Sequence, residues 1–68
     1  MKPGDLYIMD LPESFYQNLW SECEYGTIVG ETHQGEPCLV LEIQSQQVKF
    51  LTSSGKIGWI NKERFYEP

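Results

Sequence analysis

PCLVLEIQSQQVKFLTSSGKIGWI, residues 37–60, contains three short apolar runs separated by two polar segments. Apolar and polar or small side chains alternate over residues 38–43 and again over 48–50. Alternation in runs of about four to eight residues is typical of half-buried antiparallel strands. The separators, 44–47 and 53–56, consist of polar and turn-forming residues. The stretch therefore predicts three consecutive strands joined by tight turns.

The segments before this meander predict two further strands. Residues 6–9, LYIM, follow a Pro-Gly turn, and alternation places Leu6 and Ile8 on one face, which we assign to the core. Residues 26–31 form the second predicted strand, and the turn at 33–36 contains a glycine suited to a positive φ. Together with the meander, these segments indicate an all-β domain of about five antiparallel strands.

Two segments are predicted to depart from simple strands. Residues 10–25 form a long connection, in which Phe15, Leu19 and Trp20 recur at helical spacing and predict a short helix with Asp10 or Ser14 as its cap. We expect this segment to fold over the domain, pinned by Phe15, Leu19 or Trp20. Near the end of the chain, residues 61–64 resemble a single helical turn with Asn61 as its cap. We expect residues 65–66 to return as a last short strand.

Length and composition are those of one small domain, residues 1–68, in the sequence given. The hydrophobic fraction of 40% is that of a globular rather than a disordered chain. No apolar run approaches the length of about 18 residues needed to span a bilayer, and the first residues do not resemble a signal peptide. We therefore expect a cytoplasmic protein without a membrane partner.

The charge is −5 and is unevenly distributed. Residues 1–42 carry eight of the ten acidic residues and one base, whereas residues 43–68 carry four bases and two acids. An acidic domain is a poor match for phosphate backbones and a better match for a basic protein surface. The alternative interpretation is that the charge only maintains solubility.

Three pieces of the chain together resemble a Src-homology-3-like barrel. These are the opening PGDLY (3–7), the meander, and the ending GWINKERF (58–65). The ending is similar to the glycine-aromatic-aliphatic segment of that fold, in which one helical turn precedes the final strand. The opening, residues 35–43 and the ending are also similar to short barrel proteins of tailed bacteriophages, mostly of unassigned function. The resemblance implies a small barrel, and a host cytoplasm if the protein is phage-encoded.

The resemblance also implies where peptides would bind. Members that bind proline-rich peptides use an aromatic groove beside an acidic loop. Here Tyr7 matches the first-strand aromatic residue, and the acidic residues of 10–25 match the loop. The chain departs from that pattern at the tryptophan of the third strand, where residues 38–40 read CLV, and at the groove proline, where Asn61 stands. A groove for proline-rich peptides is therefore not expected.

Metal binding and catalysis find little support in the residues. Cys23, His33 and Cys38 are the soft potential metal ligands, and they lack a paired Cys-x-x-Cys spacing. Cys38 has no neighbouring glycine-rich turn that would lower its pKa, and one histidine across a turn does not make a triad. Two cysteines are also too few for a disulfide framework. We expect no enzymatic activity, no metal and no cofactor.

Aromatic residues are dense, and we assign Phe50 and Phe65 to the core. Alternation that buries Gly58 and Ile60 places Trp59 outward, as an interface anchor. The alternative is that residues 10–25 fold over Trp59 and cover it.

The sequence thus favours a non-enzymatic module that binds a basic protein partner, as an accessory or host-modulating protein. The expected surface is an aromatic patch with carboxylates at its rim: Tyr7, Asp10, Glu13, Tyr16, Trp20 and Trp59. Loss of binding by Trp59→Ala would test it. The alternative is a nucleic-acid-associated barrel with exposed aromatic residues and a basic patch of Lys49, Lys56, Lys62 and Arg64. A third possibility is a homo-oligomer formed through a sheet edge.

Overall fold

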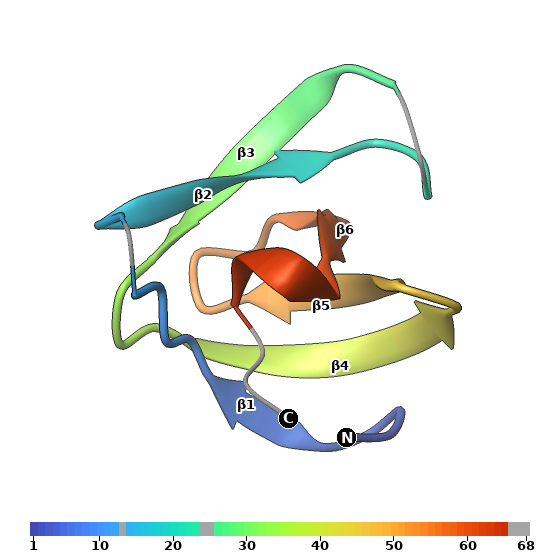
Figure 1. The fold of residues 1–68 in the computed structure, drawn as a ribbon, viewed down its shortest axis with the longest axis horizontal. Helices are drawn as coiled ribbons and strands as arrows, with labels where there is room; N and C mark the ends of the chain where they lie inside the picture. The colour runs from blue at the N-terminus through green and yellow to red at the C-terminus, as the bar shows by residue number, and fades with distance from the viewer. Residues whose placement is uncertain (13, 24–25, 66–68) are drawn as a thin grey trace.

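In the computed structural model, which describes residues 1–12, 14–23 and 26–65, six antiparallel strands form one strongly curved sheet (Figure 1). The hydrogen-bonded order of the strands is β1-β4-β5-β6-β2-β3. This arrangement confirms the predicted all-β class. The elements are β1 (Leu6–Ile8), β2 (Tyr16–Trp20), β3 (Ile28–His33), β4 (Pro37–Gln44), β5 (Gln47–Thr52), β6 (Ile57–Asn61) and the 3₁₀ helix η1 (Lys62–Arg64).

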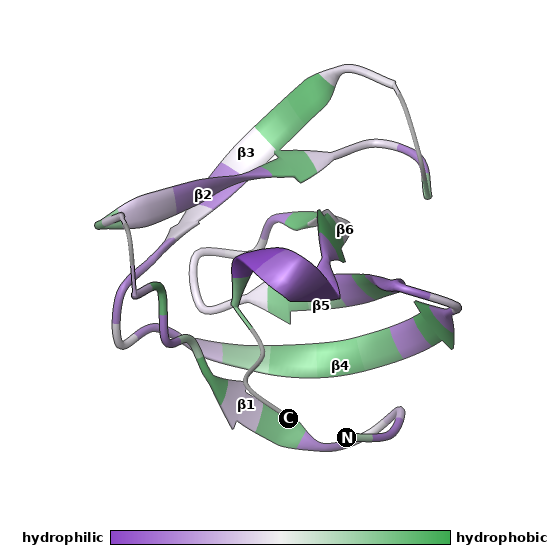
Figure 2. Cartoon of the chain, viewed as in Figure 1, coloured by the Kyte–Doolittle hydropathy of each residue, from purple (hydrophilic) through white to green (hydrophobic). Residues whose placement is uncertain are grey.

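The predicted meander is confirmed as β4, β5 and β6, paired in sequence order. Figure 2 shows β4 as an almost continuously apolar strand, as expected where both faces of a strand are covered or half-covered. The register of β4 and β5 shifts between Val40 and Glu42, where a bulge increases the local twist. The predicted turn before β4 is also confirmed, because Gly35 has a φ of 81°.

The ladder of the described residues is open, with β1 and β3 at its two edges. A closed barrel is therefore not formed by this part of the chain. The open ends are nevertheless linked near the turn between β3 and β4. Met9 donates its N–H to the Glu36 carbonyl at 2.9 Å, and Gly35 donates to the Met9 carbonyl at 2.8 Å. These bonds bring the end of β1 close to the start of the β2–β3 hairpin.

The prediction of a helix within residues 10–25 is wrong for the described part of that segment, because this part contains strand β2. A spacing of four places two side chains on the same side of either a helix or a strand, so Phe15 and Leu19 did not distinguish between them. The aromatic residues at both ends of β2 favour a strand. Ser14 was a candidate helix cap. Its hydroxyl instead donates to the Tyr16 carbonyl at 2.7 Å and accepts from the Tyr16 N–H at 3.3 Å.

The core lies between the β2–β3 hairpin and the β1-β4-β5-β6 part of the sheet. Phe50 and Phe65 are buried, as predicted, and their rings pack edge to face with centroids 5.2 Å apart. Residue Leu19 of β2 closes the core from the hairpin side. The buried cluster consists of Met9, Leu11, Leu19, Cys38, Val40, Val48, Phe50, Ile60 and Phe65.

The core face of β1 was predicted wrongly. Leu6 and Ile8 are exposed by 68% and 55%, whereas Met9 is buried and Tyr7 packs against the core. The Tyr7 ring contacts Phe65 at a centroid distance of 5.4 Å, and its hydroxyl donates to the Phe65 carbonyl at 3.0 Å. Tyr7, whose side chain is larger than those of Leu6 and Ile8 and whose hydroxyl has a hydrogen-bond acceptor, thus takes the inner position on β1.

The outer face of the sheet explains why the pattern was ambiguous. Leu6 of β1 pairs with Leu39 of β4, which pairs with Leu51 of β5, which pairs with Ile57 of β6. Directly paired residues share a face, so this row of aliphatic side chains lies on the outside. Because β1 carries apolar residues on both faces, alternation alone cannot identify the inner one.

Trp59 is the clearest correction on β6. Alternation is as predicted, with Gly58 and Ile60 buried and Ile57 exposed by 49%, but Trp59 is only 7% exposed. Its partner in the sheet is Trp20, which extends the sheet beyond β6. Trp59 is therefore not an outward anchor, and the residue of 10–25 that lies beside it is Trp20, its neighbour in the sheet.

The helical turn near the end of the chain is confirmed. Asn61 precedes η1, and its side-chain oxygen accepts the Glu63 N–H at 2.9 Å, as expected for a cap. Phe65 ends the turn rather than beginning a strand. The predicted strand partner Tyr66 lies outside the described residues.

Candidate functional site

The structure separates the six residues that the sequence predicted as a partner-binding patch. Tyr7 and Trp59 belong to the interior, and Trp20, 37% exposed, lies at the far end of β2 from Tyr16. Glu13 lies outside the described residues. Asp10 and Tyr16 are the two predicted residues that the fold brings to one place, which we call the aromatic corner. It comprises a hollow of about 530 Å³ lined by Leu11, Pro12, Ser14, Phe15, Tyr16 and Gln34.

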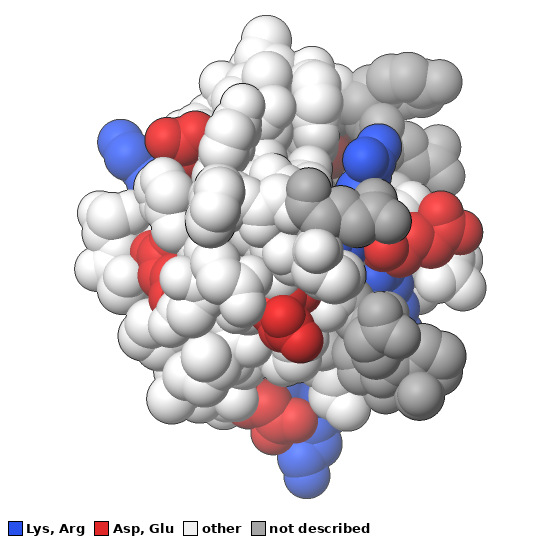
Figure 3. Space-filling model, turned by 60° about the vertical axis from the view of Figure 1, so that its left-hand side comes forward, with Lys and Arg blue, Asp and Glu red and all other residues white. Residues whose placement is uncertain are grey.

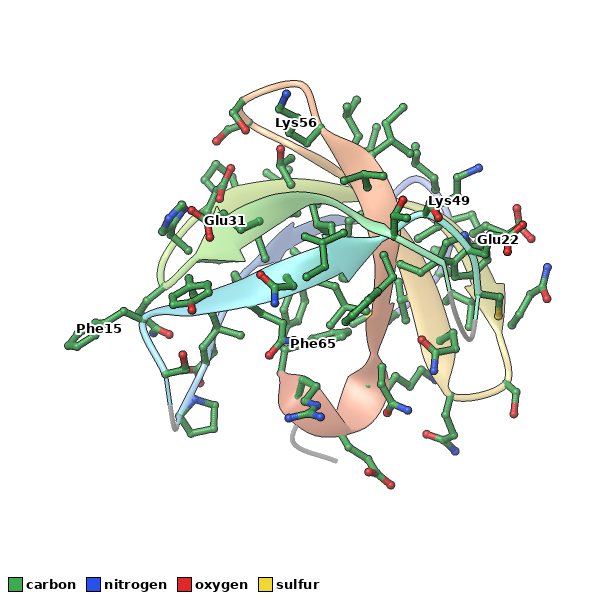
Figure 4. All side chains as sticks on the ribbon, turned by 90° about the horizontal axis from the view of Figure 1, so that it is seen from above. Phe15, Glu22, Glu31, Lys49, Lys56 and Phe65 are labelled. Carbon is green, nitrogen blue, oxygen red and sulfur yellow. The ribbon has the colours of Figure 1, made fainter. Side chains whose placement is uncertain are left out.

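Phe15 is the most exposed aromatic side chain of the described residues, at 86%. Figure 4 shows it projecting away from the start of β2 into solvent. Tyr16 beside it is 49% exposed and pairs with His33 across the hairpin. Exposed neighbouring aromatic residues beside a hollow are typical of a contact surface rather than of a core.

The backbone beneath these rings is held by hydrogen bonds. Gln34 donates its N–H to the Phe15 carbonyl at 2.9 Å, which continues the β2–β3 ladder by one position. The Gln34 side chain accepts the Leu11 N–H through Oε1 and donates through Nε2 to Asp10 Oδ1 at 3.2 Å. One amide thus ties the connection after β1 to the turn after β3. The backbone of the corner is therefore held in place by bonds within the chain itself.

Carboxylates surround the aromatic corner. Asp10 is exposed beside Gln34, and Glu31 on β3 lies 3.4 Å from His33 Nε2, next to Tyr16. Figure 3 shows carboxylates spread over this side of the molecule, with Lys and Arg mainly at the margins of the view. The corner therefore combines aromatic surface with negative charge.

Glu36 has a structural role under the same corner. Its Oε1 accepts from the Thr32 hydroxyl and the His33 N–H, both at 2.9 Å. Its Oε2 accepts from the Ser53 hydroxyl at 2.7 Å and the Ser53 N–H at 3.1 Å. Burial alone would raise the pKa of Glu36, but the hydrogen bonds from Ser53, His33 and Thr32 outweigh it and hold that pKa below its ordinary value. The carboxylate therefore ties two turns together in its ionised form.

The Cys38 thiol bonds neighbours other than His33. Cys38 is buried, and its thiol contacts the Thr32 hydroxyl at 3.3 Å rather than His33. Burial and the negative charge of Glu36 raise the pKa of the Cys38 thiol, and the hydrogen bond between the thiol and Thr32 offsets this only in part, so the thiol stays protonated. Cys23 and Cys38 are not joined by a disulfide. Within the described ranges, no three His, Cys, Asp or Glu side chains form a group that could hold a metal ion.

The basic residues of the alternative prediction are dispersed. Figure 4 shows Lys49 and Lys56 on the side of the view opposite η1, which carries Lys62 and Arg64. The aliphatic part of Lys56 lies over Gly30 of β3. The four cations therefore do not form one continuous patch.

Sequence reasoning missed Phe15, Glu31 and His33 as members of the site. Phe15 was interpreted as a pin of the folded loop, because an aromatic residue between polar ones is more often buried than exposed. The available signal was the mixed segment PESFYQN (12–18), in which an apolar residue has no apolar partner at the positions two before and two after it. Glu31 and His33 could be placed beside Tyr16 only once the β2–β3 pairing was known.

The described residues contain one helix, the three-residue η1, and none with the length and apolar character needed to cross a membrane. Comparisons with protein families, with curated proteins and with solved structures find no match to this chain.

Proposed function

We propose that the protein is a non-enzymatic interaction module that binds a basic segment of a partner protein at the aromatic corner. The observation that carries the proposal is the 86% exposure of Phe15 on a hydrogen-bonded backbone. Exposed apolar surface costs about 25 cal/mol per Å² relative to burial, so a partner that covers the ring gains that energy. Asp10 and Glu31 then select for Lys and Arg over acidic segments.

The scaffold of this module is part of the same proposal. The meander β4–β6, followed by a capped 3₁₀ turn and a buried Phe65, supports a Src-homology-3-like barrel. Barrels of that kind in tailed bacteriophages are the proteins that the sequence resembles, and an accessory or host-modulating role is the corresponding proposal. The binding surface differs from the expected one, since Tyr16 is kept, Phe15 is added, and Tyr7, Trp20 and Trp59 are not part of it.

A selection of peptides tests the proposal before any natural partner is identified. A random peptide library displayed on phage is selected on immobilised wild-type protein, and the enriched peptides are synthesised. We expect enrichment in Lys and Arg, and affinities that fall as salt screens the carboxylates. Phe15→Ser should weaken binding by about tenfold or more, as for a hot-spot residue, while the domain remains folded because the ring is in solvent.

Ile57→Ser is the matched control, because Ile57 is also an exposed apolar residue but lies on β6. It should leave the affinity of the selected peptides unchanged. Peptides without basic enrichment, or basic peptides that bind Phe15→Ser as tightly as the wild type, would rule out the aromatic corner as the binding surface.

A further inference from the structure

A second, polar groove lies between β2 and η1. It consists of two adjoining hollows of about 630 and 510 Å³, within the range usual for ligand sites. Four residues line both hollows: Gln17, Asn18, Asn61 and Arg64. Tyr16 borders the first hollow and Trp20 the second, so an aromatic side chain stands at each end.

The groove exists because two neighbouring strands separate. β2 pairs with β6 at Trp20 and Trp59, and a continued antiparallel ladder would place Leu19 opposite Ile60 and then Asn18 opposite Asn61. Neither pair is part of the ladder, and Asn18 and Asn61 line the groove instead. The chain thus begins a strand pairing and leaves the next two positions open.

The backbone of β2 is directed into this opening. The bond from the Gln34 N–H to the Phe15 carbonyl sets the alternation of the β2–β3 ladder. By that alternation, the N–H and C=O of Tyr16 and of Asn18 point away from β3, toward β6. The Ser14 hydroxyl bonds both groups of Tyr16. The backbone N–H and C=O of Asn18 are therefore the next groups along β2 that face the groove.

Three of the four side chains that line both hollows are not used within the described part of the chain. Gln17, Asn18 and Arg64 form no side-chain hydrogen bond or ion pair with the rest of the described chain. Asn61 uses its side-chain oxygen as the cap of η1, which leaves its NH₂ group. Amide side chains both donate and accept, as a peptide backbone does, and the guanidinium of Arg64 matches a carboxylate.

The position of the charges selects the ligand. Among the residues that the structure describes, Arg64 is the one cation that lines the groove, and Glu63 lines only the first hollow. A negatively charged group therefore fits the second hollow, beside Arg64 and Trp20 and away from Glu63. We propose that the groove binds an extended acidic peptide segment, which adds to the open edge of β2 at Asn18 and places a carboxylate on Arg64. The first hollow shares Leu11, Pro12, Ser14 and Tyr16 with the aromatic corner, whereas the second hollow, where we place the carboxylate, shares none of the corner's lining residues.

Nuclear magnetic resonance titration of the ¹⁵N-labelled protein tests this inference with three synthetic peptides. They are Ac-Val-Glu-Val-Glu-Val-NH₂ and its counterparts with Gln or Lys in place of both Glu. The Glu peptide should shift the amide signals of Asn18 and Asn61 and the Arg64 side-chain signal. The Gln peptide should bind about tenfold more weakly or worse, since it removes the charge-assisted hydrogen bond. The Lys peptide should leave the groove signals in place, and any shifts that it causes near Phe15 concern the proposed function alone.

Arg64→Gln should weaken the Glu peptide to the level of the Gln peptide, whereas Lys62→Gln should not. Lys62 is the matched control because it lies on the same helical turn without lining either hollow. Arg64 is exposed, so its replacement should leave the folded spectrum intact. The inference is overturned if the Glu peptide leaves the groove signals unshifted at millimolar concentration or binds Arg64→Gln unchanged. It is also overturned if an oligothymidylate shifts those signals and the Glu peptide does not.

Discussion

Glu36 shows at the scale of one residue how an acid can stabilise a small acidic protein. Its carboxylate accepts four hydrogen bonds that link the turn before β4 to the turn after β5. Glu36→Gln replaces a charged acceptor of two N–H groups and two hydroxyls with a neutral amide that has one acceptor oxygen. We expect it to lower the free energy of unfolding by about 1–3 kcal/mol at pH 7, measured by urea denaturation.

The same residue predicts a dependence of stability on pH. The pKa of Glu36 is lower in the folded protein than its ordinary value of 4.5. Its contribution is therefore complete above the unfolded pKa and is lost as the pH falls through the folded pKa. The stability difference between wild type and Glu36→Gln should be constant from pH 7 to about pH 5 and shrink below about pH 4.5. A difference that is the same at pH 3 and pH 7 would contradict the ionised role of Glu36.

Gly58 lies at a position where the fold has no room for a side chain. A Cβ at this position would lie 2.7 Å from Leu19 Cβ and 3.1 Å from the Trp20 carbonyl oxygen. Gly58→Ala should therefore push β2 away from β6 and destabilise the fold by about 1–3 kcal/mol in thermal or urea denaturation. Gly30→Ala is the control, since the three atoms nearest to its Cβ, at 3.0–3.4 Å, belong to the Lys56 side chain and none belongs to β2. An equal loss of stability in both variants would mean that contact with β2 is not the cause.

At the scale of elements, the sequence predicted what depends on local pattern. The meander and the capped turn near 61–64 were found because alternation, turn residues and a cap are encoded next to one another. The strand β2 was missed because its spacing also fits a helix. The inner face of β1 was reversed because both of its faces are apolar, and the choice is made by Phe50 and Phe65, more than 40 residues away.

That long-range choice can be tested at Tyr7. Its hydroxyl bonds the Phe65 carbonyl and so fastens β1 to the end of η1. Tyr7→Phe keeps the ring contacts and removes this bond, and should cost about 0.5–1.5 kcal/mol in urea denaturation. Tyr7→Leu, which also removes the edge-to-face contact with Phe65, should cost more. A Tyr7→Phe protein as stable as the wild type would show that ring packing alone orients β1.

At the scale of the molecule, the candidate sites could not be predicted from local sequence patterns, because each joins segments that lie far apart in the chain. The aromatic corner joins the segment after β1, the start of β2 and the turn after β3, through Gln34. The groove depends on the β2–β6 pairing being limited to Trp20 and Trp59, which lie about 40 positions apart in the sequence. Composition indicated an acidic protein rich in aromatic residues, but not which aromatic side chains remain exposed.

The topology also predicts how stability is distributed over the molecule. β5 is paired along its length with both β4 and β6, whereas the β2–β3 hairpin joins the rest of the sheet at the single pair of Trp20 and Trp59. Leu19 and Thr32 are the residues of β2 and β3 that are buried, so they anchor the hairpin by packing. Segments with few ladder bonds to the core open at lower free energy than the core itself.

Amide hydrogen exchange followed by nuclear magnetic resonance measures this difference. The amides of Val48 and Phe50 should exchange at least about tenfold more slowly than those of Gln17 and Thr32. Leu19→Ala should accelerate exchange in the hairpin more than in β5, because it removes the hairpin's own contact with the core. If both regions instead exchange at one common rate, the sheet opens as one unit. The pairing of Trp20 with Trp59 and the packing of Leu19 would then be as strong as the continuous ladders of the meander.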